Sequence, residues 1–260
     1  MRGCEAAYYL VHSMDAAGPE YRRRDLALAE SFGRAAGRAG VPRIIYLGGL
    51  GETGQGLSEH LSSRREVEVA LGRTGVPVTV LRAAMIIGSG SASFEILRYL
   101  VERLPIMITP RWVETRCQPI GIRDVLDFLA GALEHPEVTG IVEIGGADAL
   151  SYGDMMREYA RQRGLRRLMI PVPVLTPRLS SYWVSLVSPV PSGIARPLIE
   201  GLRNEVVVRD PGPAAAFDIR PVPYAEALQR AIDRTDRHAI ESTWFDALGD
   251  PAKASLSSMT

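Results

Sequence analysis

A glycine-rich segment stands directly after a short apolar run, and its spacing is one that can bind phosphate groups. Residues 49–54 read Gly-Leu-Gly-Glu-Thr-Gly and follow the apolar run 43–47. In dinucleotide-binding proteins this spacing lets the backbone approach a pyrophosphate at the N-terminus of the next helix. Here residues 55–57 separate the last glycine from the helical segment, and the next apolar run ends in Arg82 rather than an acid. The pattern therefore favours a loop near the nicotinamide end of a dinucleotide over a pyrophosphate site.

Arginines supply the other candidate ligand contacts. The segment 111–119 is rich in side chains that can bind anions or stack on ring systems, which makes it a candidate wall of a ligand pocket. Because a guanidinium fork binds carboxylates and planar oxygens bidentately, substrate contacts are expected within this segment. The residues concerned are Arg111, Arg116 and Gln118. For Arg82 two readings stay open, a phosphate contact or an ion pair with a carboxylate such as Glu66 or Asp124.

The elements that must position these groups are strands and helices in alternation. The apolar runs 43–47 and 76–81 are separated by the glycine-rich loop and a helical segment, 58–73, which together have the size of a crossover between parallel strands. A further run, 5–11, and a helical segment, 21–39, precede them. Ligands in such sheets bind beyond the carboxyl ends of the strands. We therefore expect the loops after these three runs to open into one cleft.

The rest of the chain continues the α/β pattern and then changes character. Helical spacing is found in 94–104 and 125–133, apolar strand-like runs in 141–144, 168–173 and 206–208, and helical patterns in 194–202 and 224–232. Ser151 and Asp154 have the spacing of a capping box that opens a helix to about residue 163.

These patterns predict three parts. Residues 1–150 form a nucleotide-binding domain, 151–240 a small, mostly helical substrate or lid subdomain, and 241–260 a disordered tail. The apolar, proline-punctuated segment 174–191 could cover a substrate, contact a partner protein or rest on a membrane surface. The alternative is an ordinary small helical subdomain.

Composition narrows the functional classes. The 260 residues carry a formal net charge of zero, which argues against nucleic acid as a partner. Cys4 and Cys117 have no paired spacing, so neither a disulfide framework nor a metal site is expected. No secretory leader and no run of eighteen apolar residues is present. We predict a soluble, cytoplasmic protein.

Taken in order, these pieces resemble the NmrA-like, NAD(P)H-binding branch of the atypical short-chain dehydrogenase/reductase family. The segments that carry the resemblance are 8–14, 43–49, 81–90 and 116–124, and the likeness spans about residues 3–235. It implies a partial Rossmann-like parallel sheet that begins at the family's fourth strand. The glycine-rich segment that precedes this strand in the family has no counterpart, so a truncated chain is expected, through an internal start or as a fragment.

The resemblance also implies a cofactor, NAD(P)H, and the residues that hold it. They lie in the three loops that follow the strands. The expected cofactor-binding residues are His12, Ser13, Gly48, Gly49, Leu50, Ala83, Ala84, Met85 and Ile86. For His12 and Ser13 the alternative is a role in capping the loop and the next helix.

The family's catalytic positions carry unusual residues in this chain. Its serine position falls on Gly48 or Gly49, and its tyrosine and lysine positions fall on His60 and Arg64. The i, i+4 spacing keeps the latter two on one helix face. Histidine can donate a proton near neutral pH, although a neighbouring guanidinium favours its neutral form. The alternative roles of His60 are a polar surface residue or a ligand of the ribose or the nicotinamide amide.

Three functions follow from the resemblance. The leading one is an NAD(P)H-dependent oxidoreductase that transfers a hydride to a small molecule, a quinone, enone or carbonyl, held near Phe94, Arg111 and Gln118. The missing serine and tyrosine favour a non-catalytic regulator that senses redox state by binding NAD(P). The third is an assembly or partner-binding role through residues 174–191.

Overall fold

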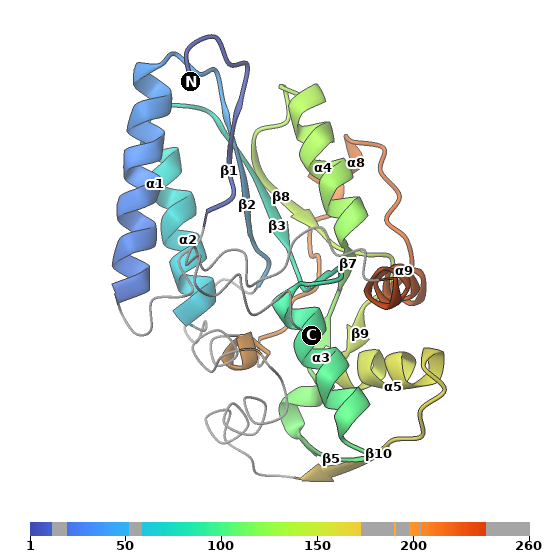
Figure 1. The fold of residues 1–260 in the computed structure, drawn as a ribbon. Coiled ribbons are helices and arrows are strands. Elements are labelled where there is room, and N and C mark those ends of the chain that lie inside the picture. Colours follow the sequence, from blue (N-terminus) through green and yellow to red (C-terminus); the bar gives the residue numbers. More distant parts are fainter. Residues whose placement is uncertain (12–19, 52–58, 173–189, 191–197, 203, 238–260) are drawn as a thin grey trace.

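The structure is a computed structural model of the chain, drawn in Figure 1. It describes all residues except 12–19, 52–58, 173–189, 191–197, 203 and 238–260. The predicted cofactor ligands His12 and Ser13, most of the segment 174–191 and the predicted tail therefore lie outside the described residues.

A four-stranded parallel sheet forms the centre of the upper half of the molecule in Figure 1. Its order is β1 (Ala7–Tyr9), β2 (Ile44–Gly49), β3 (Val78–Ala83) and β8 (Gly140–Ile144). The pairings β1–β2, β2–β3 and β3–β8 are all parallel. The predicted α/β class with a Rossmann-like parallel sheet is therefore confirmed.

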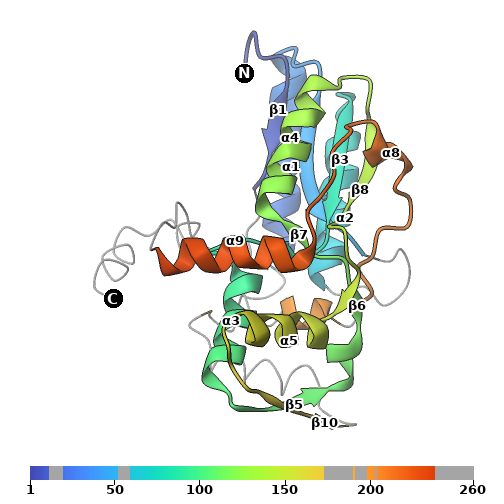
Figure 2. The ribbon, with the colours of Figure 1, turned by 90° about the vertical axis from the view of Figure 1, so that its right-hand side faces the viewer.

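Helices cover both faces of this sheet, as Figures 1 and 2 show. Helices α1 (Glu20–Arg38) and α2 (Glu59–Gly72) lie on one face, and α4 (Ile122–Glu134) lies on the other. Side chains alternate along a strand, so Ile44 and Tyr46 enter the core under α1 and α2, whereas Ile45 enters the core under α4. Burial on both faces explains why the strands read as continuous apolar runs.

The lower half of the molecule is built from two separate stretches of chain. The first supplies α3 (Ala92–Arg103), β5 (Ile106–Pro110), the 3-10 turn η1 (Arg111–Glu114) and β6 (Arg116–Cys117). The second supplies β9 (Leu150–Ser151), α5 (Tyr152–Gln162) and β10 (Leu168–Val172). One apolar core joins α3, α5 and α9 (Tyr224–Asp236), so it contains residues from both sides of position 150. The remaining elements are β4 (Ile86–Ile87), β7 (Ile120–Gly121) and α8 (Gly212–Ala215).

The structure contradicts one local prediction and supports one of the two readings of Arg82. The run 206–208 does not form a strand, because only Val206 makes a β-bridge, to Cys117, while the amide of Val208 donates to the Gln118 side chain. Of the two readings of Arg82, the structure shows the ion pair with a carboxylate. Its partner is Glu68, at 2.6 Å between Nη2 and Oε1, and not one of the two examples, Glu66 and Asp124. Both Arg82 and Glu68 are at most 16% exposed, which makes Arg82 part of the sheet–helix packing.

The capping box that the sequence predicts is present at the start of α5. The Ser151 hydroxyl accepts a hydrogen bond from the Asp154 amide, and the Asp154 carboxylate accepts one from the Ser151 amide. Because this box fixes the first turn of α5, it fixes the position of Tyr152, the residue that follows Ser151.

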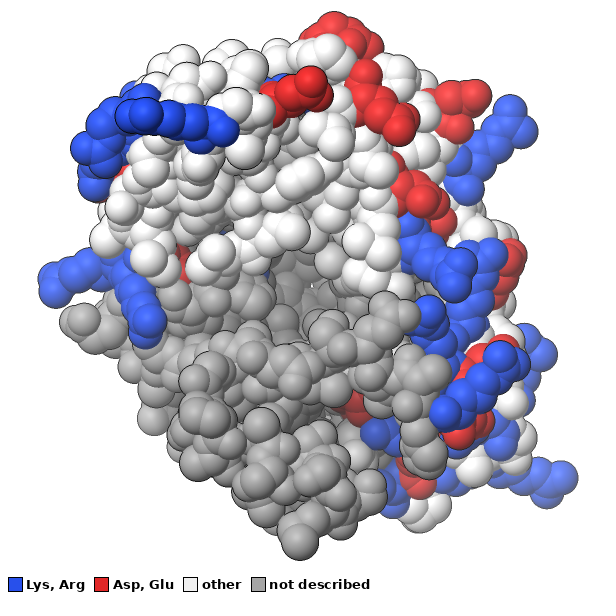
Figure 3. All heavy atoms as spheres, turned by 45° about the horizontal axis from the view of Figure 1, so that its top comes forward, with Lys and Arg blue, Asp and Glu red and all other residues white. Residues whose placement is uncertain are grey.

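The surface drawn in Figure 3 carries mixed acidic and basic side chains along its right-hand margin and basic side chains on its left. Uncharged side chains lie between them in the upper part of the view. In the part of the chain that the structure describes, no helix combines the length and the apolar character that crossing a bilayer would require. The same part contains no group of three or more His, Cys, Asp or Glu side chains that could hold a metal ion.

Candidate functional site

A cavity of about 390 Å³ opens at the carboxyl ends of β1, β2 and β3. Leu10 and the segments 47–50 and 83–86 line it, so each of the three strands leads into it. This confirms, for the described residues, the prediction that the three loops share one cleft. It is also the edge at which α/β sheets bind ligands.

The strand side of the cavity is formed by small residues, Gly48, Gly49, Ala83 and Ala84. A Cβ added to Gly48 would lie 3.1 Å from Cε1 of Tyr46, so a larger residue could be fitted there only if the tyrosine ring moved. The Leu50 amide donates to the Ala83 carbonyl at 2.7 Å, which ties the two loops together. The backbone therefore offers a ligand a shallow, fixed floor.

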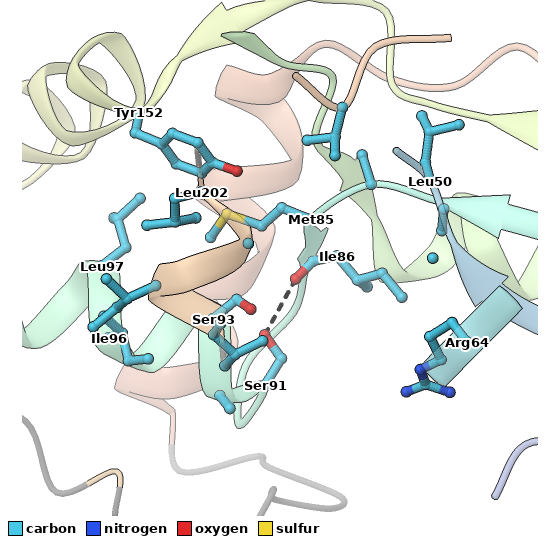
Figure 4. Close-up of a pocket in the computed structure, with 18 of the residues that line it drawn as sticks. Leu50, Arg64, Met85, Ile86, Ser91, Ser93, Ile96, Leu97, Tyr152 and Leu202 are labelled. Atoms are coloured by element: carbon cyan, nitrogen blue, oxygen red, sulfur yellow. Dashed lines mark hydrogen bonds between the residues drawn. The ribbon is translucent and has the colours of Figure 1, made fainter. Parts of the chain in front are cut away.

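The opposite walls are almost entirely apolar (Figure 4). They come from α3, η1, α5 and the stretch 198–206, and their apolar members are Ala92, Ile96, Leu97, Leu100, Trp112, Met156, Leu198, Ile199, Leu202 and Val206. Of the two serines on α3's side, Ser91 is the N-cap of α3: its hydroxyl accepts from the Phe94 amide and donates to the Ile86 carbonyl at 3.2 Å. Ser93 is the other.

Arg64 provides a positive charge among the described residues that line the cavity. Figure 4 places it on the opposite side from Leu97 and Tyr152. The Tyr46 hydroxyl donates to the backbone carbonyl of Arg64 at 3.3 Å, which ties this part of α2 to the sheet. His60 lies one helical turn earlier in α2, and the structure describes its backbone but not its side chain.

Tyr152 is the hydroxyl-bearing residue that α5 adds to the cavity. Burial, and then the charge and hydrogen bond of the neighbouring Cys117 thiol, raise the pKa of Tyr152 well above its ordinary value. The phenol therefore stays protonated near neutral pH. Its O–H group is hydrogen-bonded to the Cys117 thiol, so in this otherwise apolar wall the phenol supplies no negative charge.

Cys117 beneath this wall is expected to be unreactive. It is fully buried, and burial raises the pKa of its thiol to about 11, although hydrogen bonds from the Met85 backbone and Tyr152 oppose this. Because only the thiolate attacks disulfide reagents, titration with Ellman's reagent at pH 8 should modify exposed Cys4 rapidly and Cys117 only after unfolding. A Cys4→Ser variant should show no fast-reacting thiol. Rapid reaction of that variant would contradict the buried position of Cys117.

The four predicted substrate residues are not brought together by the fold. Phe94 is fully buried in the core between α3 and α5, and Arg111 and Arg116 are exposed. Nε2 of Gln118 donates to the Gly146 carbonyl at 2.7 Å, and its Oε1 accepts from the Val208 amide at 3.0 Å. None of the four is among the described residues that line the cavity. Their substrate contacts stay predictions that this geometry does not support.

Comparison with known proteins identifies the fold but no close relative. No protein-family model matches the sequence, and no curated protein matches it. A nucleoside-diphosphate-sugar epimerase from Staphylococcus aureus matches 88% of this chain and 77% of its own, with a TM-score of 0.68 at 15% identity. The fold is that of NAD(P)-dependent epimerases and reductases.

Two further structures with this epimerase/reductase fold were solved with a nucleotide bound. Citrobacter sp. triphenylmethane reductase complexed with NADP(H) has a TM-score of 0.66 at 15% identity, covering 88% of this chain and 77% of the reductase. The Bordetella bronchiseptica enzyme WbmG in complex with NAD has a TM-score of 0.65 at 14% identity, covering 90% of this chain and 72% of WbmG. At such identities the likeness shows the fold, and membership of the NmrA-like branch stays a prediction.

Sequence reasoning missed most of the apolar walls of this cavity. Of the predicted wall 111–119, Trp112 lines the cavity, but the neighbouring arginines do not. Tyr152 had a usable signal, because it directly follows the predicted capping serine. Nothing in the sequence marks Ile96 and Leu100 as cavity residues. The apolar residues of α3 have the same helical spacing whether they face a core or a cavity.

Proposed function

We propose that the protein binds NAD(P)H and transfers a hydride to a quinone, enone or carbonyl compound. The observation that supports this most directly is the continuity of the cavity. It runs from the small residues at the carboxyl ends of β2 and β3 to the apolar walls of α3 and α5. A nicotinamide at the strand ends and an apolar substrate against the helices would thus be neighbours.

The residues present suit the nicotinamide end of the cofactor. Gly48, Gly49, Ala83 and Ala84 leave room for a flat ring against the backbone, and Arg64 could contact a phosphate or ribose. Small-molecule sites span roughly 300–1,000 Å³, so this cavity of about 390 Å³ suits one end of the dinucleotide and a small substrate. Residues 12–19 and 52–58, which lead into α1 and α2, lie outside the described part of the chain.

The chain's own contribution to the reaction would be orientation, exclusion of water and proton donation. A bound reduced nicotinamide would supply the hydride. The apolar walls, with the neutral phenol of Tyr152 among them, would hold an uncharged ring and keep water away. His60 would be the proton donor, with Arg64 beside it in α2.

Equilibrium binding and transient kinetics together test the proposal. NADPH binding is measured by the fluorescence of the reduced nicotinamide, and turnover by stopped-flow oxidation of NADPH with a panel of quinones, enones and aldehydes. Binding with oxidation supports an oxidoreductase. Absence of binding by both NADH and NADPH would refute the proposal.

A non-catalytic NAD(P)-binding regulator is the second candidate, and the polar groups of the cavity favour it. Gly48 and Gly49 offer no hydroxyl, and the Ser91 hydroxyl is used as the cap of α3. Among the described side chains that line the cavity, few are then left to polarise the carbonyl group of a bound substrate. This candidate predicts tight binding of the reduced or the oxidised cofactor, with no oxidation of NADPH by any member of the panel.

Replacement of Arg64 tests which side of the cavity faces the charged part of the cofactor. An Arg64→Gln variant should bind NADPH about 10–100-fold more weakly, because a hydrogen bond to a charged group is worth about 1.5–3 kcal/mol. The Tyr46 hydroxyl bonds the backbone of residue 64, so this link survives. Fluorescence titration measures the affinity. An Arg34→Gln variant, at an exposed position on α1, serves as the control. Equal NADPH affinity of the wild-type and Arg64→Gln proteins would show that Arg64 does not contact the cofactor.

A further inference from the structure

An exposed apolar surface lies on the small sheet of β5 and β10, at the end of the molecule opposite the chain's N-terminus (Figures 1 and 2). The two strands pair in parallel, with Leu168 opposite Ile106 and Ile170 opposite Ile108. Paired residues share a face, so these four side chains form one patch, which we call the β5–β10 face. They are 56%, 56%, 42% and 55% exposed, in that order.

The opposite face of the same sheet is packed normally. Met107 and Thr109 are buried, and Met169 packs against the core formed with α3 and α5. The sheet is therefore held in place by its inner face. The four outer side chains contribute little to that packing. Single exposed apolar residues are common, but a contiguous group of four large aliphatic side chains on a flat sheet marks a surface that binds something.

Arginines border the β5–β10 face. Arg166 and Arg167 directly precede β10, and Arg103 ends α3 just before β5. Arg167 donates to the carbonyls of Val101 and Glu102, so its charge is held at the end of α3 by neutral acceptors. Arg161 and Arg163, earlier in the chain, pair with Glu158 and Asp236, so they add little net charge here. The positive charge beside β10 therefore comes from Arg166 and Arg167.

We infer that the β5–β10 face docks on an anionic lipid surface. A membrane interface accepts aliphatic side chains below the headgroups while arginines bind lipid phosphates, and each basic residue near such a surface contributes favourably. A second copy of the chain fits less well, because two such faces packed together would bring their arginines close to one another.

Vesicle binding by the full chain tests this inference. Sedimentation with phosphatidylcholine vesicles that contain phosphatidylglycerol should show binding that weakens with added salt, and pure phosphatidylcholine should bind far less. Ile108→Glu should reduce the partition coefficient at least about tenfold, since it removes an apolar contact and adds a negative charge. Leu126→Glu is the matched control, because Leu126 on α4 is also 55% exposed. Arg166→Ala should reduce binding about fivefold.

The outcomes separate the possible occupants. Lack of binding to the anionic vesicles, or equal loss in the Ile108→Glu and Leu126→Glu variants, would overturn the inference. A different result would indicate that the face joins two copies of the chain. In that case the wild-type protein does not bind vesicles, and gel filtration without lipid shows that Ile108→Glu converts a dimer to a monomer. Far-ultraviolet circular dichroism and thermal unfolding show that each variant is folded.

Discussion

NADPH is expected to bind the Ala84→Trp variant about 100-fold more weakly than the wild-type protein. Ala84 follows β3 and lines the cavity between Ala83 and Met85. An indole ring at this position would occupy the space in which the proposed site places the nicotinamide. Forcing a ligand and an extra ring into one cavity typically costs 1–3 kcal/mol or more, and 2.7 kcal/mol corresponds to about 100-fold in affinity. Fluorescence titration with NADPH measures the change.

The control for this variant places the same ring where it meets no cavity. Ala130 is exposed on α4, so Ala130→Trp should leave the NADPH affinity unchanged. Thermal unfolding should show that both variants are folded, with Ala84→Trp less stable by no more than about 3 kcal/mol. If a folded Ala84→Trp variant bound NADPH as tightly as the wild-type protein, the cofactor would lie elsewhere and the proposed site would be wrong.

The sheet could be predicted from the sequence because each buried parallel strand is visible there as a continuous apolar run. Each is buried on both faces, so runs such as 43–47 and 76–81 are apolar throughout and their order follows from the crossovers between them. The floor of the cavity was predictable for the same reason. Once the strands are aligned, the residues at and just beyond their carboxyl ends, Gly48 to Leu50 and Ala83 to Ile86, must lie side by side.

The opposite walls of the cavity could not be predicted in this way. Their positions depend on how α3 and α5 pack on each other, and that packing is encoded by contacts between residues far apart in the sequence. Gln118 illustrates the limit: an amide beside arginines suggests a ligand contact, yet its partners are the backbones of Gly146 and Val208. The type of a polar residue in the sequence does not show whether its side chain hydrogen-bonds to a ligand or to a distant loop.

The Phe94→Ala variant is expected to lose about 3–5 kcal/mol of unfolding free energy. The sequence suggested that Phe94 contacts a substrate, but the ring is fully buried and packs against Tyr159, with 6.3 Å between ring centroids. Removing it leaves a void in the core shared by α3, α5 and α9. Denaturant unfolding followed by circular dichroism measures the loss. Because the ring does not line the cavity, NADPH affinity should change little under conditions in which the variant stays folded.

Tyr99 on the same helix provides the comparison. Its ring is partly exposed and lies beneath the guanidinium groups of Arg98 and Arg103, at 4.2 and 4.6 Å from the ring centroid. Tyr99→Ala should therefore cost only about 1 kcal/mol, mainly the lost cation–π contacts. A Phe94→Ala variant as stable as Tyr99→Ala but with a raised KM for the accepting substrate would place Phe94 in the substrate site. Its burial predicts the reverse, a large loss of stability with an unchanged KM.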